Sequence, residues 1–205
     1  MKVCWVKMKH RFVAGFYLVL QLLLIWFNWG SDVDGLYVWY CNNVLLLFAL
    51  SFYFEKYQVV KGLINVGFLA QLIWVLDVLS FVLFGNFLFG FSDYLFNLEH
   101  TALFVTTILI HVFSSFVALY FVFDKETKKE SLMYSFFYVL ALYFLVLLFT
   151  NPQSNVNCVF EICGLEEVII IPFYTYLWPF LTFLVFALPT YYFQNYLSRV
   201  RGEGE

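Results

Sequence analysis

Six long apolar stretches divide this chain, and short segments that contain charged residues, Gly, Asn or Pro separate them. A bilayer core of about 30 Å requires about 20 apolar residues per helix, which is close to the length of each stretch. None of them shows the polar and apolar alternation that marks the strands of a membrane β-barrel. We therefore predict an all-α fold, a polytopic six-transmembrane-helix bundle, with spans at residues 12–29, 36–54, 62–84, 101–123, 132–149 and 168–192.

The composition excludes a soluble globular protein and a nucleic-acid-binding protein. Hydrophobic residues make up 63% of the 205 residues and charged residues only 12%, whereas about a quarter of an average soluble domain is charged. Six spans use most of this length, so residues 1–205 are expected to form a single membrane domain. The 11 Lys and Arg residues are dispersed over short segments, which leaves no basic surface to bind the phosphates of a nucleic acid.

Lys and Arg occur only at the two ends of the chain and around alternate connections between the predicted spans. If the N-terminus is cytoplasmic, all 11 fall on the cytoplasmic side, within residues 2–11, 56–61, 125–129 and 199–201. The outer connections carry acids alone: Asp32, Asp34, Asp93, Glu99, Glu161, Glu166 and Glu167. Cytoplasmic loops of membrane proteins collect Lys and Arg, so we predict a multi-pass protein with both termini inside (N-in/C-in), in the plasma membrane of a prokaryote.

Two segments are expected to depart from a bundle of straight helices. The connection at 85–99 is rich in Phe and poor in charge, which favours a position along the outer interface, where it could act as a lid. Pro179 and Pro189 lie inside the last predicted span, and a proline ring removes a backbone donor and bends a helix. We expect a bent packing helix there, with a substrate gate as the alternative.

The cysteines fall in different settings. Cys158 and Cys163 share the outer connection, in the sequence NVNCVFEIC, where an oxidising exterior allows a disulfide if the Cα atoms lie within about 7 Å. A zinc site is disfavoured, because these two ligands are half of the four that a closed site needs. We expect neither a metal nor another cofactor. Cys41 stands apart, at the outer end of the second span.

Few polar side chains lie inside the predicted spans, and each is costly in hydrocarbon. Asp77 lies in the outer part of the third span, and one face of the fourth carries His100, Thr107, His111 and Ser114. The helical rise places Cys41 about 8 Å, Asp77 about 10 Å and His111 about 12 Å below the outer boundary. We therefore expect these three residues to meet in one pocket that opens toward the outer leaflet.

A Cys and a His that meet can carry out nucleophilic catalysis. The imidazole of His111 would take the proton of the Cys41 thiol, and the thiolate is the nucleophile. Asp77 would accept the other imidazole N–H and orient the ring. Candidate substrate-binding residues are Asn42, His100, Thr107 and Ser114. Structural roles stay open for each catalytic candidate: Cys41 as a small buried hydrophobe, His111 as an interhelical hydrogen-bonding residue, and Asp77 as a group that pins two helices.

Five segments carry a resemblance to a known family. In YVWYCNNVLLLFAL an apolar helix opens with a Cys, at Cys41; INVGFLAQLIWVLD is a Gly-, Ala-, Leu- and Gln-containing helix that ends at Asp77; and ILIHVFSSFVALYFVF is a His-bearing helix that matches at His111 rather than His100. FTNPQSNVNCVF and YTYLWPFL are similar to a late Asn-bearing loop and an aromatic-Pro last helix. Over residues 36–190 the chain thus resembles the bacterial YwaF-type integral membrane proteins. Their animal relatives include an ether-phospholipid acyltransferase, and androgen-induced membrane hydrolases of fatty-acid esters are more distant relatives.

The resemblance implies a membrane-embedded acyl-transfer or ester-hydrolysis site, with Cys41 as nucleophile, His111 as base and membrane lipids as partners. The chain departs from the family pattern at Val75 and Leu76, which replace a Thr-Pro before the acid, and at Asn155 to Cys158, which match an Asn-Tyr loop signature loosely. A small-solute or proton transporter with Asp77 and His111 as relay groups is the alternative. A non-catalytic membrane assembly or partner protein is a third, and association into a homo-oligomer stays open.

The predicted topology can be tested by labelling single cysteines introduced into the connections. Glu126→Cys is expected to react with a membrane-impermeant maleimide only after the membrane is permeabilised, because its segment carries Lys residues that stay inside. Glu161→Cys, in an outer connection, is expected to react without permeabilisation. Labelling of Glu126→Cys in intact cells would overturn the topology.

Overall fold

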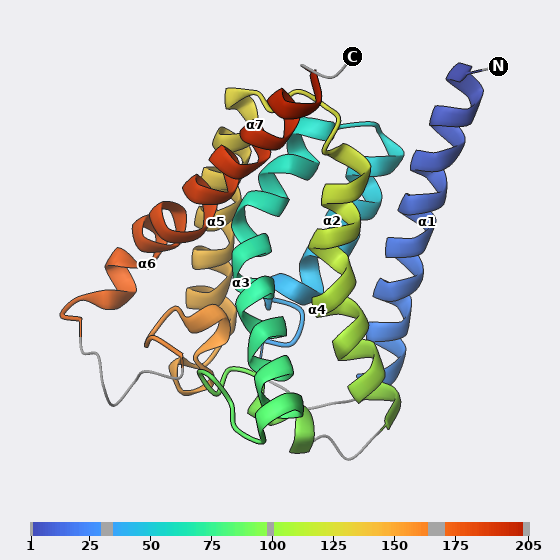
Figure 1. Ribbon diagram of the computed structural model, residues 1–205. Coiled ribbons are helices and arrows are strands. Elements are labelled where there is room, and N and C mark those ends of the chain that lie inside the picture. The colour runs from blue at the N-terminus through green and yellow to red at the C-terminus, as the bar shows by residue number, and fades with distance from the viewer. Residues whose placement is uncertain (1, 30–34, 98–100, 164–170, 203–205) are drawn as a thin grey trace.

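The computed structural model describes residues 2–29, 35–97, 101–163 and 171–202, which form helices and turns without a strand (Figure 1). The helices are α1 (Lys2–Phe27), α2 (Tyr40–Tyr53), α3 (Tyr57–Phe84), α4 (Thr101–Val122), α5 (Lys129–Phe149), α6 (Tyr174–Thr182) and α7 (Leu188–Gly202). The π-helical segment η4 (Phe183–Ala187) joins α6 to α7, and short 3-10 turns are η1 (Asp93–Asn97), η2 (Pro152–Ser154) and η3 (Val156–Cys158). The predicted all-α fold is confirmed.

Five helical stretches are long and apolar enough to cross a membrane: Met8–Phe27, Tyr57–Phe84, Thr101–Val122, Lys129–Phe149 and Tyr174–Val200. They are consistent with a multi-pass integral membrane protein, and each overlaps a predicted span. The remaining prediction, residues 36–54, corresponds to α2, which has only 14 residues. At about 1.5 Å per residue, α2 is about half as long as the 28-residue α3 beside it.

Side-chain hydrogen bonds explain why α2 begins later than predicted. Asn42 and Asn43 fold back and donate to carbonyl oxygens of the turn before the helix, at Leu36, Val38 and Trp39. Asn side chains that bond nearby backbone groups compete with helical hydrogen bonds. The segment 36–39 therefore forms turns, although its apolar residues fit a span.

Both termini lie at one end of the bundle, together with the α2–α3 and α4–α5 connections (Figure 1). The described cationic residues lie at or near this end: Lys9, Arg11, Lys56, Lys61, Lys125, Lys128, Lys129 and Arg199. The alternation of charges along the sequence predicts this arrangement. That this end faces the cytoplasm stays a prediction.

Helix α3 is the central helix and packs against α2, α4, α5, η4 and α7. Its residues 60–68 are all buried. Within that stretch, the Asn65 amide donates to Ser135 Oγ of α5 at 3.0 Å and accepts from Gln194 Nε2 of α7 at 2.6 Å. Because lipid is as apolar as the helix surfaces, such interhelical hydrogen bonds and close packing hold membrane helices together.

Gln71 is a second buried polar residue of α3, and it connects this helix to α4. Gln71 Nε2 donates to Ser114 Oγ at 2.6 Å, and Gln71 Oε1 accepts the backbone N–H of Ser115 at 3.2 Å. The Tyr17 hydroxyl of α1 donates to the Ser114 carbonyl. Gln71 and Ser114 thus join α3 to α4, and Tyr17 adds α1.

The last helical stretch changes its winding between its two internal prolines. Pro179 lies inside α6, η4 is wound as a π-helix, and Pro189 follows at the start of α7. π-Segments are a known cause of bends in helices and adapt the hydrogen-bond ladder to an interruption. The prolines predict a bend, and the structure shows a π-helical change of winding between them.

Glycine brings α2 and α3 into close contact. The Tyr40 ring lies on Gly67, where a Cβ would sit 1.9 Å from Tyr40 Cζ. The Tyr40 hydroxyl donates to the Leu63 carbonyl one turn earlier at 2.8 Å. Tyr40 begins α2, so Gly67 provides the space in which this helix starts.

We predict that Gly67→Ala destabilises the protein, because overpacking a filled site costs about 1–3 kcal/mol. Gly15→Ala is the matched control, since nothing lies within 4 Å of a Cβ at Gly15. Thermal unfolding of both variants in detergent measures the difference. Equal midpoints for the two variants would contradict the packing described.

Candidate active site

Cys41 is the second residue of α2 and is a free, half-buried thiol. Its Sγ donates to Asn42 Oδ1 at 3.5 Å, while the Asn42 N–H donates to the Trp39 carbonyl at 3.0 Å. The N-terminus of a helix favours negative charge through its N–H groups and dipole. The first turn of α2 therefore suits a thiolate better than a mid-helix position would.

Asn157 fixes the start of α2 from a distant loop. Its Oδ1 accepts the backbone N–H of Tyr40 at 2.8 Å, and its Nδ2 donates to the Val38 carbonyl at 2.9 Å. The Trp178 indole N–H of α6 donates to the Asn157 carbonyl at 3.1 Å. Sequence reasoning missed this contact, because 117 positions separate Asn157 from Tyr40 and neither segment signals the other.

In the loop that carries Asn157, a disulfide joins the next residue, Cys158, to Cys163, and their Cα atoms lie 5.4 Å apart. That separation is within the distance predicted for this pair. Inside the loop, Asn155 Oδ1 accepts the backbone N–H groups of Phe160 and Glu161, each at 3.0 Å. The loop is thus tied together by its own groups as well as to α2 and α6.

His111 lies on α4, half-buried, with its Nδ1 2.9 Å from the Thr107 carbonyl. A carbonyl only accepts hydrogen bonds, so Nδ1 carries the proton and Nε2 carries the free electron pair. The ring stacks on Trp74 of α3 with centroids 4.2 Å apart. The imidazole is held in an orientation that leaves Nε2 able to act as a base.

Asp77 holds the outer connection rather than the imidazole. The side chain is fully buried. Its two oxygens accept the backbone N–H groups of Phe89 at 2.7 Å, Gly90 at 3.2 Å and Ser92 at 2.9 Å, and the Ser92 hydroxyl at 2.9 Å. The predicted orientation of His111 by Asp77 is not found, since the Thr107 carbonyl occupies Nδ1. Asp77 fixes the Phe-rich connection expected to act as a lid.

Trp74 contacts His111 and lies near Tyr94 of η1. The Tyr94 hydroxyl lies near the Trp74 indole N–H and in the neighbourhood of Cys41, and Trp74 stacks on His111. Trp74 is buried, and its N–H has no hydrogen-bond acceptor of normal geometry among the described residues. Among the described residues, no hydrogen bond joins the Cys41 thiol to the His111 imidazole.

The other described site residues have structural contacts, of which only that of Ser114 joins two helices. Ser114 binds Gln71, and Asn42 donates to the Leu36 carbonyl while it accepts the thiol of its neighbour. Thr107 contributes its carbonyl to His111. His100 lies outside the described residues. Across the described ranges, no group of three or more His, Cys, Asp and Glu side chains is placed to hold a metal ion.

Loss of the Asn157 side chain is expected to expose Cys41. Asn157→Ala removes two hydrogen bonds and leaves the Tyr40 N–H unpaired at a cost of about 1–3 kcal/mol, because the Val38 carbonyl keeps its bond from Asn43. Cys41 should therefore react with N-ethylmaleimide about tenfold faster or more. Reduction of the disulfide should act in the same direction. Peptide mass spectrometry at Cys41 gives the rate, with Asn86→Ala in an exposed turn as control. An unchanged rate would show that Asn157 does not position α2.

Comparisons with models of protein families, with characterised proteins and with solved structures find no match for this chain. The resemblance to the YwaF-type proteins stays an expectation drawn from short segments of the sequence.

Proposed function

We propose that the protein is a membrane-embedded acyl-lipid acyltransferase or ester hydrolase, with Cys41 as nucleophile and His111 as general base. The observation that carries the proposal is the state of the imidazole, because Thr107 fixes the tautomer in which Nε2 is a free base. The free thiol at the start of α2 is the candidate nucleophile by sequence pattern, and Trp74 stacks on the proposed base His111.

The reaction begins when His111 Nε2 takes the proton of the Cys41 thiol, directly or through one water. The thiol must first turn away from Asn42 Oδ1, which accepts it at 3.5 Å. The thiolate attacks the carbonyl carbon of a lipid ester, and the C–O bond breaks. The imidazolium returns its proton to the departing alcohol, and a thioester forms on Cys41.

The second half of the reaction decides between transfer and hydrolysis. His111 Nε2 takes a proton from the hydroxyl of a second lipid or from water, and that oxygen attacks the thioester carbonyl. The C–S bond breaks, and the proton passes to the Cys41 sulfur. The Cys41 N–H in the first turn of α2 would stabilise the negative oxygen that develops in both halves. The Asn42 N–H is not available for this role, since it donates to the Trp39 carbonyl at 3.0 Å.

A small-solute or proton transporter is the second candidate. Its support is the presence of four buried polar side chains on α3, at Lys61, Asn65, Gln71 and Asp77, although they bond to different neighbouring segments. Relay of protons through Asp77 would have to break its four hydrogen bonds to the outer connection. This requirement makes Asp77 a poorer relay group than sequence reasoning supposed.

We predict that Cys41→Ser and His111→Ala each reduce the turnover of a labelled phospholipid by about 10²- to 10⁴-fold. The double variant should lose little more than either single variant, since residues that act as a unit are not additive. Purified proteins in liposomes give the rates, and Cys4→Ser is the control for loss of a thiol.

A transporter gives a different pattern in the same liposomes. His111→Ala should then alter pH-dependent flux, while Cys41→Ser should be almost silent. Full lipid turnover by Cys41→Ser would remove the nucleophile and the mechanism with it. A non-catalytic partner protein would be inert in both assays.

A further inference from the structure

The indole N–H of Trp74 is a buried hydrogen-bond donor without an acceptor of normal geometry. Trp74 lies on α3 and is only 5% exposed, and among the described residues no atom accepts its Nε1–H. The N–H of a buried tryptophan usually has a partner, and a donor left unpaired costs about 1–3 kcal/mol. Such a group needs a physical reason, and one reason is that it is kept free for a ligand.

The free donor lies beside the proposed base. The Trp74 ring stacks on the His111 imidazole, with centroids 4.2 Å apart. Three residues away from each ring, the hydrogen bond between Gln71 and Ser114 joins α3 to α4, so the pair of rings is supported by a contact one turn away. An oxygen that accepts the Trp74 N–H would therefore lie close to the imidazole.

The outer connection brings Tyr94 to this donor. The Tyr94 hydroxyl lies near the Trp74 N–H, but no hydrogen bond of normal geometry joins them. Tyr94 belongs to η1, follows Ser92 of the segment that Asp77 holds, and is 43% exposed. Its side chain can thus turn aside without breaking a regular hydrogen bond to Trp74, and a ligand oxygen can then take its place.

The surroundings of the N–H fit a neutral acceptor rather than an anion. No Lys or Arg occurs in residues 62–124, which include the rest of α3, the outer connection and α4. Asp77 lies three residues after Trp74 and therefore on the same face of α3, where its carboxylate repels a phosphate. The carbonyl of an ester is a neutral oxygen acceptor, and it is also the reacting group of the proposed substrate.

We propose that the Trp74 indole N–H binds the carbonyl oxygen of a lipid ester beside His111, and that Tyr94 covers this donor until a lipid replaces it. The inference rests on the proposed function, because His111 is the base next to which the ester is held. A preorganised donor in a site without water also stabilises the negative oxygen that forms on attack. Trp74 is thereby a substrate-binding residue that the sequence pattern did not indicate.

NMR of the indole N–H groups tests this contact without catalysis. The protein is labelled with ¹⁵N-tryptophan in detergent, and Trp74→Phe identifies the Trp74 resonance. Two phospholipid analogues that cannot be cleaved are added: a ketone, in which CH₂ replaces the ester oxygen, and an ether, which has no carbonyl. We expect the Trp74 resonance to move downfield with the ketone only. No shift with the ketone, or the same shift with both analogues, would overturn the proposal.

Binding of the same analogues to variants gives a second measure. Trp74→Phe keeps a ring against His111 but loses the donor, so it should bind the ketone about tenfold more weakly and the ether as before. Trp26→Phe, at a side chain that is 75% exposed, is the matched control and should bind both as the wild type does. Tyr94→Phe should bind the ketone at least as tightly, because a competing hydroxyl is gone. Unchanged ketone affinity in Trp74→Phe would contradict the contact.

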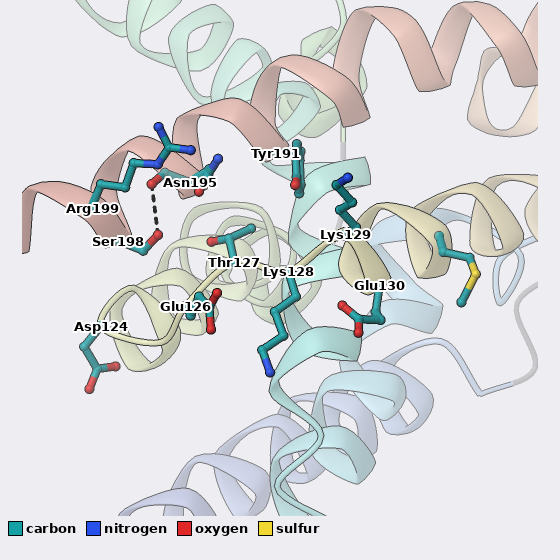
Figure 2. Close-up of a pocket in the computed structure, with 11 residues that line it drawn as sticks. Asp124, Glu126, Thr127, Lys128, Lys129, Glu130, Tyr191, Asn195, Ser198 and Arg199 are labelled. Carbon is teal, nitrogen blue, oxygen red and sulfur yellow. Dashed lines mark hydrogen bonds between the residues drawn. The ribbon is translucent and has the colours of Figure 1, made fainter. Parts of the chain in front are cut away.

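A cleft at the end of the bundle that carries both termini is the rival site for a lipid. It encloses about 810 Å³ between α7 and the α4–α5 connection (Figure 2). Cations and acids line it in equal number: Lys128, Lys129 and Arg199 with Asp124, Glu126 and Glu130. A lipid held there by its headgroup would not distinguish the ketone from the ether, so the difference between the two analogues reports on Trp74.

Failure of this contact and failure of the proposed function give different results. Full lipid turnover by Cys41→Ser with a ketone-dependent shift of the Trp74 resonance would remove the nucleophile and leave the ester-binding donor. An inactive Cys41→Ser with a Trp74 resonance that the ketone does not move would leave the nucleophile and overturn the inference.

Discussion

A backbone group inside a membrane protein must find a hydrogen-bond partner within the protein, and the start of α2 shows how this chain meets that requirement. The helix begins at Tyr40, beside the long α3, and its first N–H group is accepted by Asn157 from a loop far along the sequence. Irregular backbone at membrane depth is tolerated where protein surrounds it. The contacts of Asn157 with α2 and of Trp178 with Asn157 supply that surrounding protein.

The contact between Asn157 and Tyr40 links the disulfide to the candidate nucleophile. Asn157 directly precedes Cys158 of the disulfide, and its side chain accepts the N–H of Tyr40 at the start of α2. Cys41 is the next residue of that helix. On the other side of the bundle, Gln71 joins α3 to the helix that carries His111. The proposed nucleophile and base thus lie on helices whose positions relative to α3 are set by buried polar contacts rather than by apolar burial, which gives little preference between helix and lipid.

Much of the fold could be predicted from the sequence, because the length of an apolar stretch and the distribution of Lys and Arg are local or additive properties. The same patterns could not place the start of α2, which depends on hydrogen bonds from the Asn42 and Asn43 side chains to carbonyl groups of the preceding turn.

For the site, the burial of Asp77 and Ser114 followed from the cost of polar groups in hydrocarbon. The partners of Asp77 did not, since three of its four hydrogen bonds come from backbone N–H groups, which every residue type but proline carries.

The central claim is that Cys41 carries the acyl group during the reaction, and mass spectrometry of the Cys41 peptide tests it most directly. The wild-type protein is mixed with a phospholipid of defined acyl chain and quenched in acid within the first turnover. The account predicts a peptide in which the acyl group replaces the thiol hydrogen of Cys41, and release of that group by neutral hydroxylamine. Turnover of the lipid without an acyl group on Cys41, or with the group on another residue, would contradict the account.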